Sequence, residues 1–255
     1  MAGLHPDPAP FIAQAHHLLE ESGKRNLILR VVGALAFHMH CPQFNYIQKE
    51  TNRYFTDIDF MAYTEQKNAI EKMFVELGYI DDPRIKTVPG LRRSIFFTRD
   101  HAWHSDVFYD VLDFSHEINF RGRLEIDNPT ISLVDLLLEK MQIVRINEKD
   151  IIDTLMLLCE HDVGDHDHEV INIDYLAVTC KADWGLWKTV TTNLDKVNRL
   201  ADDYAILTDE NKKTIRDRLQ RITDRIEQEP PTLRWQVRSR IGERIKWYRD
   251  VDEVM

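Results

Sequence analysis

Apolar positions in the first half of the chain change between the two-residue period of a strand and the wider period of a helix. Helices are expected at residues 11–22, 34–40 and 66–77, the last ending at Gly78. Strands are expected at residues 27–32, 54–63, 94–98 and 103–114, and a further one at 118–126 that Gly122 interrupts. Strands that alternate with helices predict an α/β layer.

The pattern changes after Pro129. Residues 132–135 fit a capping box ahead of an apolar run to Val144, and Asn147 can cap the next helix. Residues 171–251 read as mostly helical, with a break at Pro230-Pro231. We therefore expect an α/β (α+β) lobe with a mixed sheet and flanking helices over 1–128, an all-helical lobe over 129–255, and a cleft between them.

Composition places the chain among ordinary globular proteins. It has 255 residues, of which 43% are hydrophobic and 30% charged. No apolar run approaches the roughly 20 residues of a membrane span. Residues 1–10 lack the basic segment and apolar core of a signal peptide. The three cysteines are far apart and form neither a disulfide framework nor a metal motif. These features predict a cytoplasmic protein with no membrane partner.

Charge is distributed unevenly along the chain. The total is −10, which argues against a general nucleic-acid coat. Residues 212–249, however, hold twelve basic and five acidic side chains, a balance of +7 that leaves −17 for the remainder. This basic segment is either a solvated face or a surface for an RNA acceptor or a protein partner.

Two aspartates on one expected strand give the clearest chemical signal. Asp57 and Asp59 are two positions apart, so their side chains point to the same face. Neighbouring carboxylates repel unless a cation lies between them, and divalent metal ions serve that purpose. Gly33 permits a tight turn at the start of a helix, where phosphate can approach. A third carboxylate would come from Asp106, with Asp110 as the alternative.

These residues resemble the nucleotidyltransferase superfamily with the DNA polymerase β-like fold. The match lies in Gly33-Ala34, in Arg53-Tyr54-Phe55-Thr56-Asp57-Ile58-Asp59 and in Asp106-Val107. In that family a Gly-Ser or Gly-Gly turn precedes a paired Asp-x-Asp, and a third acid follows on a later strand. Lys140 to Arg145 and Lys149 to Asp153 are similar to the lysine helix and the (Arg/Lys)-Asp-x-x-Asp helix of the AbiEii-type, minimal nucleotidyltransferase branch.

The resemblance implies a role for each matched residue. Asp57, Asp59 and Asp106 would be catalytic ligands of two Mg²⁺ ions. The nucleoside triphosphate would lie against a further set of residues: Gly33, Ala34, Arg53, Thr56 and Lys140. Asp150 and Asp153 would be accessory polar residues near the acceptor.

The implied reaction transfers a nucleoside monophosphate from a nucleoside triphosphate to an acceptor hydroxyl on RNA, protein or a small molecule. The AbiEii-type branch includes toxins of toxin–antitoxin pairs, so an antitoxin protein is a potential partner. Many members of the family have Ser or Thr where this chain has Ala34. Two alternatives therefore stay open: a catalytically inactive binding protein that keeps the fold, and an aminoglycoside-type small-molecule nucleotidyltransferase.

Overall fold

The chain forms two compact units. The structure is a computed structural model that describes residues 7–82, 92–101 and 103–250. The first unit contains residues 1–40, 51–112 and 119–132, and the second contains 41–50, 113–118 and 133–255. Each unit therefore includes stretches from more than one part of the sequence.

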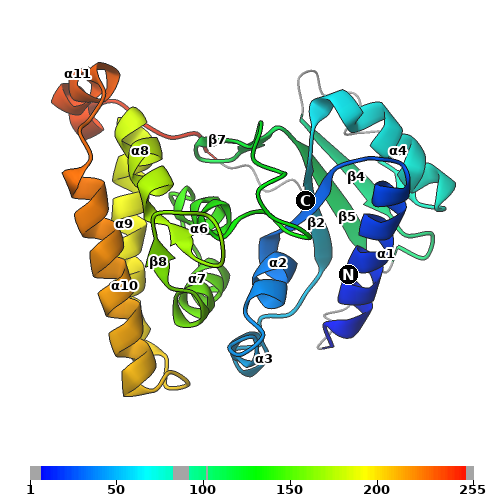
Figure 1. The fold of residues 1–255 in the computed structure, drawn as a ribbon, viewed down its shortest axis with the longest axis horizontal. Helices are drawn as coiled ribbons and strands as arrows, with labels where there is room; N and C mark the ends of the chain where they lie inside the picture. The colour runs from blue at the N-terminus through cyan, green and yellow to red at the C-terminus, as the bar shows by residue number, and fades with distance from the viewer. Residues whose placement is uncertain (1–6, 83–91, 102, 251–255) are drawn as a thin grey trace. The chain divides into compact units, whose positions relative to one another are not determined.

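A five-stranded mixed sheet forms the centre of the first unit (Figure 1). Its order is β1 (Leu29–Val32), β2 (Asp57–Ala62), β5 (His104–Tyr109), β4 (Arg93–Phe97), β3 (Ile80–Asp81). The β2–β5 pair is parallel and the other three pairs are antiparallel. The α/β class with a mixed sheet, predicted from the sequence, is confirmed.

Helices α1 (Ala9–Lys24), α2 (Gly33–His40) and α4 (Lys67–Glu76) pack against this sheet, with the short turn η1 (Thr64–Gln66) ahead of α4. The ring of Phe74 in α4 stacks on Phe96 with centroids 4.1 Å apart, and meets Phe60 edge-on at 6.4 Å. Aromatic pairs of this kind add to the stabilisation from apolar burial. One face of the sheet is therefore the apolar core beneath α4.

Strand alternation determines what the opposite face carries. Phe60 faces α4, so Asp57 and Asp59 in the same strand point to the other side. Directly paired residues of neighbouring strands share a face. His104 and Asp106 of β5, which pair with Asp57 and Asp59, therefore lie on this same polar side.

The second unit is built mainly from helices. They are α3 (Tyr46–Glu50), α6 (Leu133–Met141), α7 (Glu148–Glu160), α8 (Ile173–Ala182), α9 (Trp184–Leu200), α10 (Asp209–Gln228) and α11 (Leu233–Ile241), with the short turns η2 (Ala201–Asp203) and η3 (Gly242–Arg244). The predicted break at Pro230-Pro231 separates α10 from α11. The expectation of an all-helical lobe needs one correction: β8 (Val163–Gly164) and β9 (Ile171–Asn172) form a short parallel pair.

The predicted cap of α7 is confirmed. The Asn147 side chain accepts a hydrogen bond from the Asp150 N–H at 3.1 Å, and the Asp150 carboxylate accepts from the Asn147 N–H at 3.4 Å. This reciprocal capping box satisfies two N–H groups that a helix start leaves without an intrahelical partner. Within the described part of the chain, no helix is both long and apolar enough to cross a membrane.

The expected strands at 103–114 and 118–126 are shorter than predicted. The first ends at Tyr109 because Asp110 adopts a left-handed φ of 61°, and the chain resumes as β6 (Val111–Asp113). The second is only β7 (Glu117–Asn119), which pairs with β6. Strand alternation therefore stops before Asp110, so the two-residue spacing that makes Asp110 the alternative to Asp106 does not continue to it.

Asp110 instead holds the end of β5 in place. Its carboxylate accepts hydrogen bonds from the Thr64 N–H at 3.1 Å and from Arg121 at 2.9 Å. Burial acts to raise the pKa of Asp110, but these hydrogen bonds outweigh it and hold that pKa below its usual value. The carboxylate thus stabilises the fold above the ordinary aspartate pKa, and this contribution is lost as the pH falls through the lower folded-state value.

We expect Asp110→Ala to lower the free energy of unfolding by about 2 kcal/mol, because it removes the acceptor for Thr64 and places a Cβ without polar support at a left-handed φ. Asp110→Asn should lose less, since asparagine tolerates this conformation and keeps an acceptor, but it should weaken the acid dependence of stability. Urea denaturation followed by circular dichroism measures both. Asp217→Ala, on the exposed side of α10, is the matched control. Equal losses in Asp110→Ala and Asp217→Ala would contradict this role.

Candidate functional site

Two carboxylates lie next to each other across the parallel strand pair. The register of β2 and β5 places Asp59 opposite Asp106 and Asp57 opposite His104. Opposite residues on one face bring their Cβ atoms to within roughly 5 Å of each other. The acidic side chains of Asp59 and Asp106 are therefore neighbours, and Asp57 follows two positions along the same face.

Gly33 lies directly against this pair. Val32 pairs with Asp59, so the next residue begins α2 beside the Asp59 side chain. Gly33 has a φ of +69°, and a Cβ at this position would come within 2.5 Å of Asp59 Oδ2. Only glycine combines this backbone conformation with so close an approach. The N-terminal end of α2, where a helix favours negative charge, thus adjoins the carboxylates.

Asp106 is the most buried of the three aspartates and has a cationic neighbour. One oxygen, Oδ2, forms an ion pair with Arg93 of β4, whereas Oδ1 is buried and has no hydrogen-bond partner among the described residues. Burial raises the pKa of Asp106; Arg93 and then His104 oppose the rise, and Asp57 adds to it.

Asp57 is held by two polar contacts. The Thr56 hydroxyl donates to Asp57 Oδ1 at 3.3 Å, and His104 Nε2 lies 3.7 Å from Asp57 Oδ2. The His104 ring also packs against Phe97, with centroids 5.7 Å apart. About a third of the Asp57 side chain is exposed, so this end of the acidic row is open to solvent.

Within the described ranges, no group of three His, Cys, Asp or Glu side chains forms a ready-made metal site. The sequence predicted that Asp57, Asp59 and Asp106 converge on a shared cation, and that convergence stays a prediction. Arg93 pairs with one oxygen of Asp106 and so places a positive charge beside that carboxylate. The buried Oδ1 of Asp106 nevertheless lacks a partner among the described residues, and aspartate oxygens are the donors that Mg²⁺ prefers.

The remaining first-unit candidates lie close by in sequence. Ala34 follows Gly33 in the first turn of α2. Arg53 precedes β2, and its Nη1 donates to the Tyr54 carbonyl at 3.1 Å. Thr56 reaches Asp57, as described above, so the clearest role of its hydroxyl in the structure is to orient that carboxylate.

Lys140, Asp150 and Asp153 come together in the second unit. Lys140 Nζ lies 3.3 Å from Asp153, 3.4 Å from Asp150 and 3.4 Å from Glu139. The lysine is buried, so it does not extend its amine to solvent in the manner of a lysine that merely covers a core helix. Three carboxylates thus surround one ammonium group.

The interior end of this cluster is fixed and its outer end is open. Asp153 is fully buried and also accepts a hydrogen bond from Gln48 of α3 at 3.2 Å. Lys140, Glu139 and Asp150 line a cavity of about 730 Å³. A ligand in that cavity would therefore meet a lysine whose position three carboxylates determine.

Sequence reasoning missed four residues of these two groups: Arg93, His104, Glu139 and Gln48. His104 had a usable signal, because it lies two positions before Asp106 and so shares its face. Glu139 is adjacent to Lys140 in the sequence. Arg93 and Gln48 had none, since their contacts depend on the β4–β5 register and on the position of α3.

No family model and no curated protein matches this chain. Among solved structures it is similar to that of the antibiotic-resistance factor ANT(2'')-Ia, with 14% sequence identity and a TM-score of 0.44. The match covers 68% of this chain and 95% of the other.

We expect Gly33→Ala to lower the free energy of unfolding by about 2 kcal/mol, because the added Cβ meets Asp59 Oδ2 at an unfavourable φ. Gly23→Ala is the matched control. Gly23 lies in α1 at an ordinary helical φ, and a Cβ added there would meet no atom within 4 Å, so this change should stabilise by up to about 1 kcal/mol. Urea denaturation measures both, and two changes of the same sign would refute the close approach at Gly33.

We expect Lys140→Met to destabilise the chain by about 3 kcal/mol, because it leaves the fully buried Asp153 carboxylate without its cation. Lys140→Met with Asp153→Asn should recover part of the loss, since the amide carries no charge. Lys213→Met, at an exposed position of α10, is the control. A double variant no more stable than Lys140→Met would show that this ion pair is not the source of the loss.

Proposed function

We propose that the chain is a nucleotidyltransferase that moves a nucleoside monophosphate from a nucleoside triphosphate to an acceptor hydroxyl with the help of Mg²⁺. The observation that carries the proposal is the register of Asp59 beside Asp106, with the Gly33 turn packed against Asp59. This arrangement joins paired carboxylates to a helix start that favours phosphate. The same residues carry the resemblance of the sequence to the nucleotidyltransferase superfamily.

Asp57, Asp59 and Asp106 would hold the metal, which we expect as two Mg²⁺ ions. Their oxygens suit a hard divalent cation, and the buried Oδ1 of Asp106 lacks any other partner in the described part of the chain. When bound, Mg²⁺ would neutralise phosphate charge and lower the pKa of the attacking hydroxyl. Arg93 keeps Asp106 in the site, and Thr56 and His104 orient Asp57.

The substrate contacts follow from the elements next to the carboxylates. Gly33 keeps the start of α2 clear of a Cβ, so the triphosphate can approach the backbone at Gly33 and Ala34. Arg53, four residues before the start of β2, is the proposed cationic phosphate contact in the first unit. Without a hydroxyl at position 34, triphosphate binding depends on backbone amides and on these neighbours.

The second unit would contribute Lys140 as a nucleotide or phosphate contact, with Asp150 and Asp153 as accessory residues near the acceptor. Their mutual contacts and the adjoining 730 Å³ cavity support this part of the proposal. The acceptor would be RNA, a protein or a small molecule. We further propose that the chain belongs to the AbiEii-type branch and has an antitoxin protein as a partner. We also propose that it is cytoplasmic and that the boundary between its two lobes follows residue 128.

A catalytically inactive protein with the same fold is the second candidate, and two observations favour it. Arg93 pairs with one oxygen of the carboxylate that would be the third metal ligand. Ala34 replaces the hydroxyl that many family members place at the phosphates. In that case Arg93 would serve as a permanent replacement for a metal ion at Asp106.

We expect Asp57→Ala with Asp59→Ala to reduce transfer of label from each α-labelled triphosphate to total RNA, protein or an aminoglycoside by at least about 1,000-fold, because both proposed metal ligands in β2 are lost. The matched control is Asp165→Ala with Asp217→Ala, two exposed aspartates of the second unit. Circular dichroism verifies that both variants fold. Transfer that survives in the β2 variant would exclude the mechanism.

Titration calorimetry separates the two candidates without requiring a known acceptor. The enzyme should bind a non-hydrolysable triphosphate with heat that depends on Mg²⁺ or Mn²⁺, and the β2 double variant should lose that dependence. If the chain is a catalytically inactive protein, the unmodified chain should give no metal-dependent heat.

A further inference from the structure

The C-terminal helix α11 exposes apolar side chains that the fold does not cover. Nine large apolar side chains are exposed in the described part of the chain, and four of them fall between residues 233 and 245. Leu233, Val237 and Ile241 are 80%, 62% and 37% exposed, and Ile245 just beyond α11 is 59% exposed. No residue of α11 is buried. An apolar concentration of this kind indicates an interaction site.

The exposed stripe is not the side by which α11 is attached. Leu233, Val237 and Ile241 recur every four residues and therefore lie along one side of the helix. Trp235, two positions from Leu233 and from Val237, points away from them and packs edge-on against Trp187 of α9 at 5.1 Å. The aliphatic side of α11 therefore remains available.

A hollow of about 980 Å³ adjoins the stripe, and Leu233, Val237 and Ile241 form part of its wall. Trp184 and Leu186 of α9, only 6% and 4% exposed, form part of the lining. The stripe and this hollow together make a concave groove within the second unit, lined by both apolar and polar side chains.

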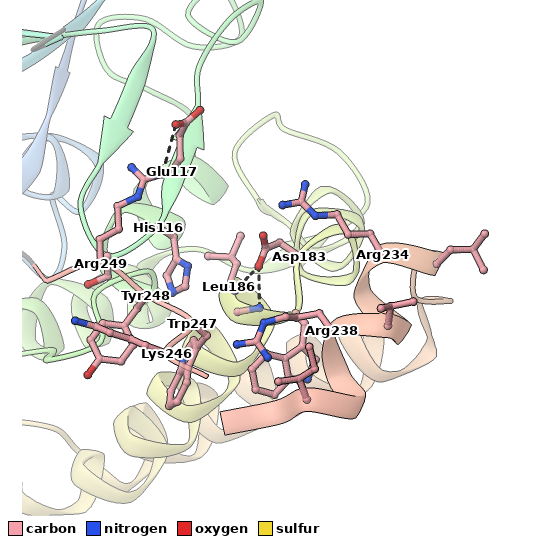
Figure 2. Close-up of a pocket in the computed structure, with 16 residues that line it drawn as sticks. His116, Glu117, Asp183, Leu186, Arg234, Arg238, Lys246, Trp247, Tyr248 and Arg249 are labelled. Atoms are coloured by element: carbon pink, nitrogen blue, oxygen red, sulfur yellow. Dashed lines mark hydrogen bonds and ion pairs between the residues drawn. The ribbon is translucent and has the colours of Figure 1, made fainter. Parts of the chain in front are cut away.

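Figure 2 shows how polar groups surround the hollow: Glu117 and Arg249 lie on one side and Arg234 on the other. Arg249 N–H donates to the Ser115 carbonyl at 3.0 Å, which attaches the last described segment to the second unit. Trp247 donates from Nε1 to the Thr189 hydroxyl at 3.2 Å. The far wall of the hollow is therefore anchored.

The groove is also positively charged. Residues 232–249 contain six arginines or lysines and one glutamate. Lys246 pairs with Asp250 and Arg249 with Asp113, so these two cations are balanced within the chain. Arg234, Arg240 and Arg244 are exposed and form no ion pair with any residue that the structure describes. Arg238 differs, because it donates to the carbonyls of Gly242 and Ile245 at 2.6 and 2.7 Å and lies over the Trp184 ring. Three cations are therefore available to a partner.

Charge and shape restrict the class of partner. A second copy docked through the same face would bring the exposed Arg234, Arg240 and Arg244 of both copies together, which is repulsive. A flat lipid surface would leave the hollow beside the stripe unfilled. RNA would need exposed rings for stacking, but the exposed side chains of the stripe are aliphatic and Trp184 is buried. A helix with apolar side chains on one side and carboxylates on the flanks fits both the groove and its charge.

We propose that α11, η3 and the adjoining hollow form a docking groove for an acidic amphipathic helix of another protein. Apolar side chains of that helix would lie on Leu233, Val237 and Ile241 and enter the hollow. Its carboxylates would pair with Arg234, Arg240 and Arg244. The groove acts independently of transfer chemistry, so it does not depend on the function proposed above.

The test uses the full chain and a fluorescein-labelled peptide of about 20 residues, in which leucines recur every three or four positions and the flanks are glutamate. We expect a dissociation constant on the order of 10–100 μM by fluorescence anisotropy, weakening as salt rises. Val237→Glu should weaken binding about 10-fold and Arg240→Glu about 5-fold. Lys213→Glu makes the same charge change as Arg240→Glu but lies outside the groove, on exposed α10, and should leave binding within about 2-fold.

Two further controls make the result decisive. A peptide of the same composition with scrambled leucines should bind at least about 5-fold more weakly, and the Asp57→Ala, Asp59→Ala variant should bind as the unmodified chain does. The proposal fails if the scrambled peptide binds equally well, if Val237→Glu has no effect, or if no binding is seen. Phosphatidylserine vesicles and single-stranded RNA are tested in the same way, and a loss of their binding in Val237→Glu would show that they bind at this groove. The proposal also fails if either binds there more tightly than the peptide.

Discussion

Repulsion between carboxylates on one face of the sheet is the constraint on which the first unit depends. Asp59 and Asp106 lie directly opposite each other in a parallel pair, where like charges destabilise a sheet. The Gly33 turn brings the positive end of α2 to Asp59, and Arg93 brings a guanidinium to Asp106. Both neighbours reduce the repulsion, yet one buried oxygen of Asp106 still lacks a hydrogen-bond partner among the described residues. That oxygen is the position at which we propose that an added cation binds.

The second unit handles buried carboxylates differently. Asp153 is fully buried, but Lys140 and Gln48 both reach it, and Lys140 also lies close to Asp150 and Glu139. A buried ion pair of this kind contributes little net stability, but losing one partner is costly. This contrast explains why we propose the metal at Asp106 and not at Lys140, where a cation is already present. The lysine cluster is better suited to positioning a ligand in the cavity beside it.

The proposed docking groove, formed by α11, η3 and the adjoining hollow, combines two surface properties. Exposed arginines and exposed aliphatic side chains both occur on α11 and η3, so positive charge and apolar area lie beside the same groove. Cations without intramolecular partners and apolar area without a cover are each unremarkable on a protein surface. Their combination beside a hollow lined by Trp184 indicates recognition of an acidic, partly apolar partner.

Local sequence determined most of the elements, because periodicity and capping act within a few residues. The helix after Asn147, the strand that carries Asp57 and Asp59, and the break at Pro230-Pro231 could be predicted this way. The candidate carboxylates and the glycine turn were also visible as a motif.

Contacts between distant segments could not be predicted from the sequence. The left-handed turn at Asp110 ended a strand that β-propensity alone would continue, and its carboxylate binds Thr64 and Arg121. Only the tertiary structure decided which charges meet: Arg93 has no sequence signal that links it to Asp106, because the contact depends on how β4 and β5 align. A sequence pattern specifies which side chains share a face, whereas which face is covered, and by what charge, depends on the packing of segments far apart in the chain.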